Sequence, residues 1–420
     1  MRQVLVLGAD GFIGRHLAFG LRAAGWQVTA QARRAGRLAE MGFTTLEADL
    51  TDPATHAPGF WAAALPHGTA LVNAAGLLTG TEATFAGVHR DAPRAALAAL
   101  QGPAVLVSAI GTGADTPFAR WRRETEAVFA GHTILRPGLV LADTSYGGSS
   151  LLRAFAALPG RLPVVGAGGQ PFNPIHAADL AAVVVECLNA PPGPGPREGA
   201  WEIGGPEVLD QSDLALVLRR WMGLPAAPLL RLPLPLARAL GRLGEALRMG
   251  PVSATAVAQL EHGVLADPAP LLARVAARPR ALSAFLTARP AGTQDLWQAR
   301  LYLLKPLIRL ALAAMWLASA ALGLFLPAAE FLPRLGALPG WVLETMARAG
   351  GIADLALGLA LLRDWRPKRV AQAQIALVAV YTAGLTLIAP GLWLDPFGGL
   401  LKNLPVLALL LVHLALAEER

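Results

Sequence analysis

The chain has 420 residues, with 36 lysines and arginines against 29 aspartates and glutamates and a net charge of +7. Hydrophobic residues make up 54% of it and charged residues only 15%, which is too apolar for an ordinary soluble enzyme. Three of the cations are lysine, and the arginines are spread along the chain, which argues against a nucleic-acid partner. The one cysteine, Cys187, excludes an internal disulfide and suits a reducing compartment.

The chain opens with a short apolar run, Val4 to Leu7, then the turn sequence GADGFIG at residues 8–14 and a helical pattern from His16 to Ala24. A buried strand, a glycine turn and a helix predict the first unit of a dinucleotide-binding fold, with the pyrophosphate on the helix amides. The expected cofactor-binding residues of this turn are Gly8, Asp10, Gly11, Phe12, Ile13 and Gly14. The turn ends the apolar run too early for a secretory signal, so we expect this part of the chain in the cytoplasm.

A second strand is predicted over Gln27 to Ala32, followed by Arg33 and Arg34. An acidic residue at this place would hold the ribose hydroxyl of NAD, whereas guanidinium groups suit the 2′-phosphate of NADP. The pair therefore favours NADP(H) over NAD(H). The alternative is that both arginines are merely solvated.

Further strands are predicted over Thr44–Leu50, Ala70–Val72 and Val105–Val107. With these strands the chain resembles the short-chain dehydrogenase/reductase superfamily, in particular its extended and atypical branches, which include NmrA-like proteins and the NADPH-binding accessory subunit of respiratory complex I. The matching pieces are GADGFIG, ADL at 48–50, NAAG at 73–76, LVSAIG at 106–111, ILRPG at 134–138 and PFNPIHAADLA at 171–181.

The resemblance covers about residues 1 to 300 and implies an α/β fold, a doubly wound parallel Rossmann sheet with a small helical lobe. It implies that Asp49 and Leu50 lie by the adenine and that Ala74, Ala75 and Gly76 line the cofactor. It also implies that Ser108 lies near the nicotinamide and that Pro137 enters the substrate side.

The superfamily usually transfers protons with a Tyr-x-x-x-Lys pair, and this chain departs from that pattern. Phe118 stands at the tyrosine position and Arg122 at the lysine position. A phenyl ring has no proton to give, and an arginine that can still bind the cofactor ribose is a poor proton relay. A shifted alignment does not restore the pair, because residues 1–304 contain no lysine and the first 300 residues contain one tyrosine, Tyr146.

Two interpretations remain. In the first, another group donates the proton, with Tyr146 and Ser108 as the catalytic candidates and His176 as a weaker one. In the second, the domain binds NADP(H) without turnover and senses redox state or supports a membrane assembly. Loop tyrosines more often pack than catalyse, and His176 has the position of a helix-entry residue, so the second interpretation is slightly favoured. No metal site is predicted.

After residue 206 a helical lobe broken by prolines is expected up to residue 300, with Leu234–Leu247 either packed on the protein or lying on a membrane surface. Four apolar segments then predict four transmembrane helices, namely Leu310–Leu326, Trp341–Leu362, Val370–Ala389 and Leu400–Ala417. The basic loop at 363–369 places both termini in the cytoplasm, and Trp341, Trp365 and Trp393 fall at predicted helix ends.

Several ionisable side chains fall within these segments. Glu344 and Arg348 are spaced to pair on one helix face, and Asp354 is the candidate for a proton or ligand site, against an internally bonded structural role. The pattern resembles the DoxX-like four-helix membrane proteins, through Arg309 with Trp316, Asp354 with Gly358, and GLLKNLP at 399–405.

The sequence thus predicts three parts: a Rossmann domain over 1–206, a substrate-side lobe over 207–300 and a DoxX-like membrane domain over 301–420. The expected location is a bacterial inner membrane. The expected partners are a nucleotide, membrane lipid, and an apolar small molecule or a membrane complex. If active, the protein is an NAD(P)H-dependent oxidoreductase.

Overall fold

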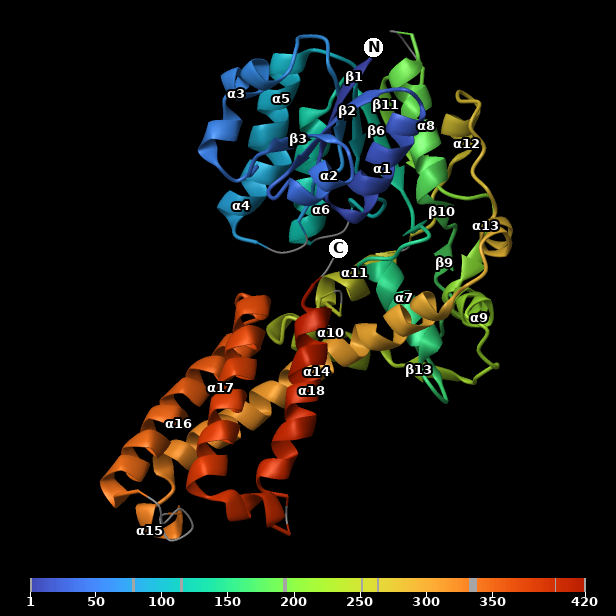
Figure 1. Cartoon of the computed structure of the whole chain (residues 1–420). Coiled ribbons are helices and arrows are strands. Elements are labelled where there is room, and N and C mark those ends of the chain that lie inside the picture. The colour runs from blue at the N-terminus through green and yellow to red at the C-terminus, as the bar shows by residue number, and fades with distance from the viewer. Residues whose placement is uncertain are drawn as a thin grey trace. The chain divides into compact units, whose positions relative to one another are not determined.

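The computed structural model describes residues 2–77, 80–113, 116–191, 195–250, 252–262, 264–331, 338–396 and 398–418 (Figure 1). They form two compact units. Unit 1 comprises Met1–Arg242 and Pro251–Ala299, and unit 2 comprises Leu243–Gly250 and Arg300–Arg420. The chain passes into unit 2 close to the expected start of the membrane domain at residue 301. The further division at residue 206 stays a prediction.

Unit 1 is built on a parallel seven-stranded sheet in the order β11-β6-β5-β4-β1-β2-β3. Apart from the added edge strand β11, this is the order of a doubly wound dinucleotide-binding sheet. The strands are β1 (Gln3–Leu7), β2 (Gln27–Ala32), β3 (Thr44–Glu47), β4 (Ala70–Asn73), β5 (Ala104–Val107), β6 (Thr133–Pro137) and β11 (Gly199–Ile203). The expected Rossmann fold is therefore confirmed.

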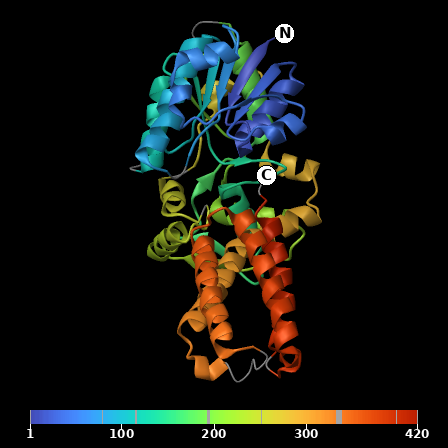
Figure 2. The same cartoon turned by 60° about the vertical axis from the view of Figure 1, so that its left-hand side comes forward.

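Helices cover both faces of this sheet, as Figure 2 shows. Val4 and Val6 of β1 pack into one hydrophobic cluster and Leu5 and Leu7 into the other, because successive side chains of a strand point to opposite faces. The first face carries α1 (Phe12–Ala23), α2 (Gly36–Glu40) and α8 (Ala177–Asn189), which includes the fully buried Cys187. The second carries η1 (Pro53–His56), α3 (Pro58–Ala64), α4 (Glu82–Ala86), η2 (Gly87–Asp91), α5 (Ala92–Leu100) and α6 (Pro117–Val128).

The remainder of unit 1 forms a lobe with its own hydrophobic cluster, which includes Phe172, Leu214, Leu218 and Phe285. Its strands are β7 (Val140–Leu141), β8 (Leu162–Val165), β9 (Pro171–Phe172), β10 (Ile175–His176), β12 (Leu209–Asp210) and β13 (Leu229–Leu232). Its helices are α7 (Gly148–Ala157), α9 (Gln211–Trp221), α10 (Leu234–Ala246), whose last residues belong to unit 2, α11 (Ala254–His262) and α13 (Leu282–Ala288). The short α12 (Ala269–Leu272) packs through Leu271 on the first face of the sheet, near β11. The stretch after residue 206 is mostly helical, as expected, and it also contains β13, which pairs in parallel with β8.

Among the described residues, three helices that lie wholly or mostly in unit 2 are long and apolar enough to cross a membrane. They are α14 (Thr293–Phe325), which starts in unit 1, α16 (Gly340–Leu362) and α17 (Pro367–Ile388). The prediction of four such helices is wrong for the last segment. There η5 (Leu400–Lys402) is a 3₁₀ turn and α18 (Asn403–Leu416) has 14 residues, about 21 Å at 1.5 Å per residue against about 30 Å of hydrocarbon. The short elements α15 (Ala328–Phe331) and η4 (Pro390–Leu394) complete the unit.

Polar contacts inside unit 2 join its helices. Asp354, 3% exposed, accepts hydrogen bonds from Ser319 Oγ at 2.6 Å and from Tyr381 Oη at 3.1 Å, so its carboxylate links α14, α16 and α17. These bonds favour an internally bonded structural role for Asp354 over a role as a proton or ligand site. Glu344 and Arg348 form the expected pair, with 3.2 Å between Oε1 and Nη2.

The amide of Gln31 ties the ends of three strands together in unit 1. Gln31 Oε1 accepts a hydrogen bond from Gly8 N–H at 2.9 Å, and its Nε2 donates to the carbonyl of Ala48 at 2.7 Å. The side chain is 1% exposed. It therefore holds the residues after β1, β2 and β3 in one arrangement.

Replacing Gln31 with methionine should lower the melting temperature of unit 1 by several degrees. The substitution leaves a buried N–H and a buried C=O unpaired, each costing about 1–3 kcal/mol. The matched control is Gln27→Met, because Gln27 is exposed and, among the described residues, its side chain accepts a hydrogen bond from Gln3 alone. Equal shifts in the two variants, measured by thermal scanning of the purified chain, would show that the Gln31 bridge is unimportant.

Candidate functional site

The turn between β1 and α1 is closed by backbone contacts that leave no room for side chains. Gly8 has a φ of +70°, which favours glycine, and a Cβ on it would lie 2.8 Å from Cα of Ala75. A Cβ on Gly14 would lie 2.1 Å from the carbonyl oxygen of Gly8. Helix α1 starts at Phe12 with Gly11 as its N-cap and no acidic residue in its first turn. Its amides and positive dipole end are therefore available to an anion.

The carboxyl ends of the parallel strands bring most of the predicted cofactor residues to one edge of the sheet. Residues 8–14 follow β1, Arg33 and Arg34 follow β2, and Asp49 and Leu50 follow β3. Ala74, Ala75 and Gly76 follow β4, Ser108 follows β5, and Pro137 ends β6. This edge, at the switch point between β1 and β4, is where doubly wound sheets bind dinucleotides.

The side chains after β2 and β3 form a charged rim. Arg33 and Arg34 are exposed. The pKa of Asp49 lies below its ordinary value, first because the backbone N–H of Thr51 donates to it, with a smaller contribution from the charge of Arg33. Glu47 accepts a hydrogen bond from Ala35 N–H at 3.2 Å. This carboxylate beside the arginines was missed in the sequence, because it is the last residue of β3 rather than a residue that follows β2.

Arg122 of α6 lies against the loop that follows β4. A Cβ on Gly76 would lie 2.4 Å from Arg122 Nη2, so only a glycine lets the guanidinium approach so closely. Nη1 is 3.3 Å from the carbonyl of Val107, and Nε has no partner among the described residues. Burial lowers the pKa of Arg122 to about 10, which leaves it charged at neutral pH. Phe118, one turn earlier, is 7% exposed, and its ring centre is 5.3 Å from Arg122 Cζ.

The hydroxyl of Ser108 is held in a buried network. Ser108 Oγ donates to Glu126 Oε1 at 2.6 Å. Arg136 Nε and Nη2 donate to the two oxygens of the same carboxylate at 2.9 and 2.6 Å. Sequence reasoning missed this pair, although an acid on α6 and an arginine within ILRPG are both visible in the sequence. The serine proton therefore points to Glu126.

His89 on η2 is a buried histidine that contacts the loop following β4. Its Nε2 accepts a hydrogen bond from Leu77 N–H at 3.2 Å, and Nδ1 lies 2.9 Å from Thr125 Oγ1. Burial, followed by the charge of Arg122, lowers the pKa of His89 to about 3. Its imidazole therefore positions the loop as a neutral group.

Tyr146 lies in the loop between β7 and α7, with 59% of its surface exposed. Two residues earlier, Thr144 Oγ1 is 2.9 Å from Nε2 of His16 on α1, so this loop reaches the helix of the glycine turn. His176 caps α8, because its Nδ1 accepts a hydrogen bond from Ala178 N–H. The predicted helix-entry role of His176 is confirmed. The catalytic roles of Tyr146 and Ser108 stay predictions.

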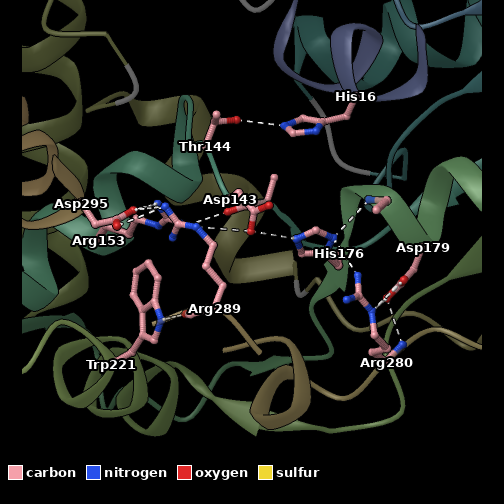
Figure 3. Close-up of polar contacts among 12 residues, drawn as sticks. His16, Asp143, Thr144, Arg153, His176, Asp179, Trp221, Arg280, Arg289 and Asp295 are labelled. Carbon is pink, nitrogen blue, oxygen red and sulfur yellow. Dashed lines mark hydrogen bonds and ion pairs between the residues drawn. The ribbon is translucent and has the colours of Figure 1, made fainter. Parts of the chain in front are cut away.

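A second group of polar side chains, which sequence reasoning missed, surrounds a narrow pocket in the lobe (Figure 3). Arg153 and Arg289 converge on Asp295, and Asp143 lies between Arg289 and His176. The one signal in the sequence is Arg153 itself, a lone charge in the apolar helix SSLLRAFAAL at 149–158. Its partners come from distant segments, so no spacing connects them.

A wider pocket of about 540 Å³ opens at the opposite edge of the sheet, where the strands begin, and is lined by Gln3, Trp26, Ala70 and neighbouring residues. It contains none of the predicted site residues. Among the described residues, no group of three or more histidine, cysteine, aspartate or glutamate side chains could hold a metal ion.

Two families match separate parts of the chain. The NAD dependent epimerase/dehydratase family matches residues 4–91, and the DoxX-like family matches residues 313–411. The chain is 26% identical over 267 residues to the mitochondrial NADH dehydrogenase (ubiquinone) 1 alpha subcomplex subunit 9 of Arabidopsis thaliana. The match covers 56% of this chain and 61% of that relative.

Two solved structures share the fold of unit 1. NADPH-dependent quinone oxidoreductase QOR2 from Escherichia coli, complexed with NADPH, has a TM-score of 0.52 and 21% identity over 68% of this chain and 99% of its own. Pal from Bacillus thuringiensis has a TM-score of 0.50 and 12% identity over 71% and 98%. The N-terminal part of the chain is therefore similar to nucleotide-binding domains of the epimerase/dehydratase family, and the C-terminal part is similar to the DoxX-like family, in the order that the sequence predicted.

Replacing Gly14 with alanine should weaken NADPH binding by at least about tenfold, because a methyl group there forces the backbone of Gly8 to move away from the phosphate site. Gly36→Ala is the matched control, since a Cβ on Gly36 meets nothing within 4 Å. Calorimetric titration of both variants with NADPH checks the prediction. Unchanged binding by Gly14→Ala would mean that the turn is not the phosphate site.

The stability of unit 1 should fall as the pH drops below 6.5, in part through His89. Its folded pKa is below its unfolded value, so the unfolded chain binds the extra proton. The stabilisation is complete above the unfolded pKa and is lost down to about pH 3. One such group contributes up to about 1.4 kcal/mol per pH unit. His89→Gln should reduce the slope of melting temperature against pH, and an unchanged slope would contradict a buried neutral His89.

Proposed function

We propose that this chain is a membrane-tethered NADP(H)-binding protein that reduces an apolar carbonyl or quinone-like acceptor. One observation carries the proposal. The edge of the sheet where the strands end keeps the glycine turn and a cation, Arg122, but the buried Phe118 stands at the position of the tyrosine that usually donates the proton. The residues fit a dinucleotide and lack the usual proton donor. This combination favours an acceptor that requires little help from an acid.

The proposed cofactor contacts follow the charges at the strand ends. The amides at the start of α1 would hold the pyrophosphate, Arg33 and Arg34 the 2′-phosphate, and Arg122 a ribose or phosphate oxygen. Each arginine offers several donors in a planar fork. When bound, the cofactor would supply the hydride, and the protein supplies proximity and orientation.

A quinone fits the missing acid better than a simple ketone does. Its reduced anion is a weaker base than an alkoxide, so it needs less protonation as it forms. General acid catalysis contributes about 10²–10⁴-fold where it operates. Tyr146 is the proposed donor for acceptors that do need a proton, because its loop contacts α1 and its side chain is exposed. The fold shared with a quinone oxidoreductase is consistent with this acceptor class.

A second function, cofactor binding without turnover, is favoured by the network around Ser108. The serine proton is committed to Glu126, and Arg136 holds that carboxylate from the other side. A relative of this chain is a subunit of a respiratory NADH dehydrogenase. The domain would then sense redox state or support a membrane complex.

The proposed location is a bacterial inner membrane with the N-terminus and the connection between α16 and α17 in the cytoplasm. A cytoplasmic C-terminus would need a fourth crossing, for which α18 is short. The loop between α16 and α17 and the first turn of α17 carry Arg363, Arg366, Lys368 and Arg369, and cytoplasmic loops are enriched in such cations. Trp341 and Trp365, at the ends of α16, are 74% and 56% exposed, as expected for side chains in the headgroup zone.

Purified full-length protein should retain NADP(H), identified by mass, and should oxidise added NADPH with a short-chain ubiquinone faster than with a simple ketone. Tyr146→Phe should lower ketone turnover by about 10²–10⁴-fold, since it removes the acid, and quinone turnover by less than about tenfold. The control Ser108→Ala should leave both rates nearly unchanged. Retained NADPH that no acceptor oxidises would contradict the reductase and favour the second function.

A further inference from the structure

The pocket in the lobe contains a buried arginine, Arg153, and a half-buried one, Arg289, some of whose N–H groups have no acceptor among the described residues. Arg153 is 4% exposed and Asp295 is 4% exposed. Arg289 Nη2 donates to Asp295 Oδ1 at 3.0 Å, and Arg153 Nη1 lies 3.7 Å from the same oxygen. Gly292 N–H also donates to Asp295, at 2.9 Å. One buried carboxylate therefore serves two guanidinium groups, and the second carboxylate near them, Asp143, is exposed and lies 3.7 Å from Arg289 Nε.

Two buried N–H groups of these arginines remain without partners. Arg153 Nε and Arg289 Nη1 have none among the described residues, although Arg153 Nη2 donates to the carbonyl of Ala142 at 2.6 Å. Buried donors are normally paired. Donors that are charged, planar and unpaired call for an anionic oxygen, and a carboxylate matches the geometry of a guanidinium.

The pocket around these donors has apolar walls. Trp221 lies against both arginines, with their Cζ atoms 4.9 and 5.6 Å from its ring, and its Nε1 donates to the carbonyl of Arg289. Leu218, Phe285 and Leu286 form the rest of the wall. The enclosed space is only about 10 Å³, which is enough for a single oxygen or water. A ligand would therefore place its charged end here and leave its apolar part outside.

Asp143 partly occupies this place in the structure. Its Oδ1 lies 3.7 Å from Arg289 Nε and 3.7 Å from His176 Nε2, which is longer than a hydrogen bond. Its side chain is 61% exposed, so it can turn out into solvent. Burial, followed by the charge of Arg280, lowers the pKa of His176, so at neutral pH this neighbour adds no positive charge to hold Asp143. A stronger carboxylate ligand could therefore displace it.

We propose that Arg153 and Arg289 form a carboxylate-binding site for an apolar small molecule, with Asp143 as an internal competitor. Combined with the reductase proposed above, on which this step rests, the site narrows the substrate class to apolar carbonyl or quinone-like compounds that also carry a carboxylate group, which binds here without reacting. Binding of the carboxylate itself does not depend on that function.

The test uses benzoate as the probe and benzamide as its neutral counterpart, titrated into the full chain by calorimetry in a chloride-free buffer. Benzoate should bind and benzamide should not. Asp143→Asn should tighten benzoate binding by about threefold to tenfold, because it removes the competing charge without removing a donor. Arg289→Met should weaken benzoate binding by at least about tenfold. Arg231→Met, at an exposed position on β13, is the control and should bind as the unchanged chain does.

Equal binding of benzoate and benzamide, or no effect of Asp143→Asn, would overturn the proposal. The Asp143→Asn result decides the matter even if Arg289→Met fails to fold. NADPH titration of the same samples separates the two proposals. If the protein binds benzoate but not NADPH, the proposed nucleotide function is contradicted and the carboxylate site is not. If it binds NADPH but not benzoate, the carboxylate site is contradicted and the nucleotide function is not.

Discussion

The close approach of two backbone segments, the carbonyl of Gly8 and the Cα of Gly14, is the constraint on which the candidate site depends. It brings the first turn of α1 against the end of β1, and the Gln31 amide fixes the same turn to the ends of β2 and β3. The amides at the start of α1 are consequently aimed at the edge where every strand of the sheet ends. The positions of Arg33, Asp49, Ala75 and Ser108 all follow from that arrangement.

The charged groups around this edge are better suited to binding a cofactor than to transferring a proton. Arg122 is buried and cationic, His89 is buried and neutral, and Ser108 donates to a carboxylate that is already ion-paired. None of these groups is free to deliver a proton where Phe118 has replaced an acid. Of the two catalytic candidates predicted from the sequence, Ser108 and Tyr146, this leaves the loop residue Tyr146. This explains why cofactor binding and turnover must be argued separately for this chain.

The sequence predicts the fold well wherever local pattern decides it. The strand, glycine turn and helix at the start and the strands β2, β4 and β5 were expected from apolar runs and glycine spacing. It failed where the outcome depends on chain geometry. The last segment was expected to be one helix from Leu400 to Ala417, but Lys402 and Asn403 interrupt its apolar run, and α18 starts at Asn403 with Pro405 in its first turn and is short. The roles of Gln31, Glu126 and Arg153 depend on partners that only the tertiary fold brings close.

The most direct measurement of the central claim is an experimental structure of the full chain with NADPH. The account predicts the pyrophosphate within hydrogen-bond distance of the backbone amides at the start of α1, and Arg33 or Arg34 on the 2′-phosphate. A nucleotide bound elsewhere, or one whose phosphates contact none of the amides between Gly11 and Gly14, would contradict it.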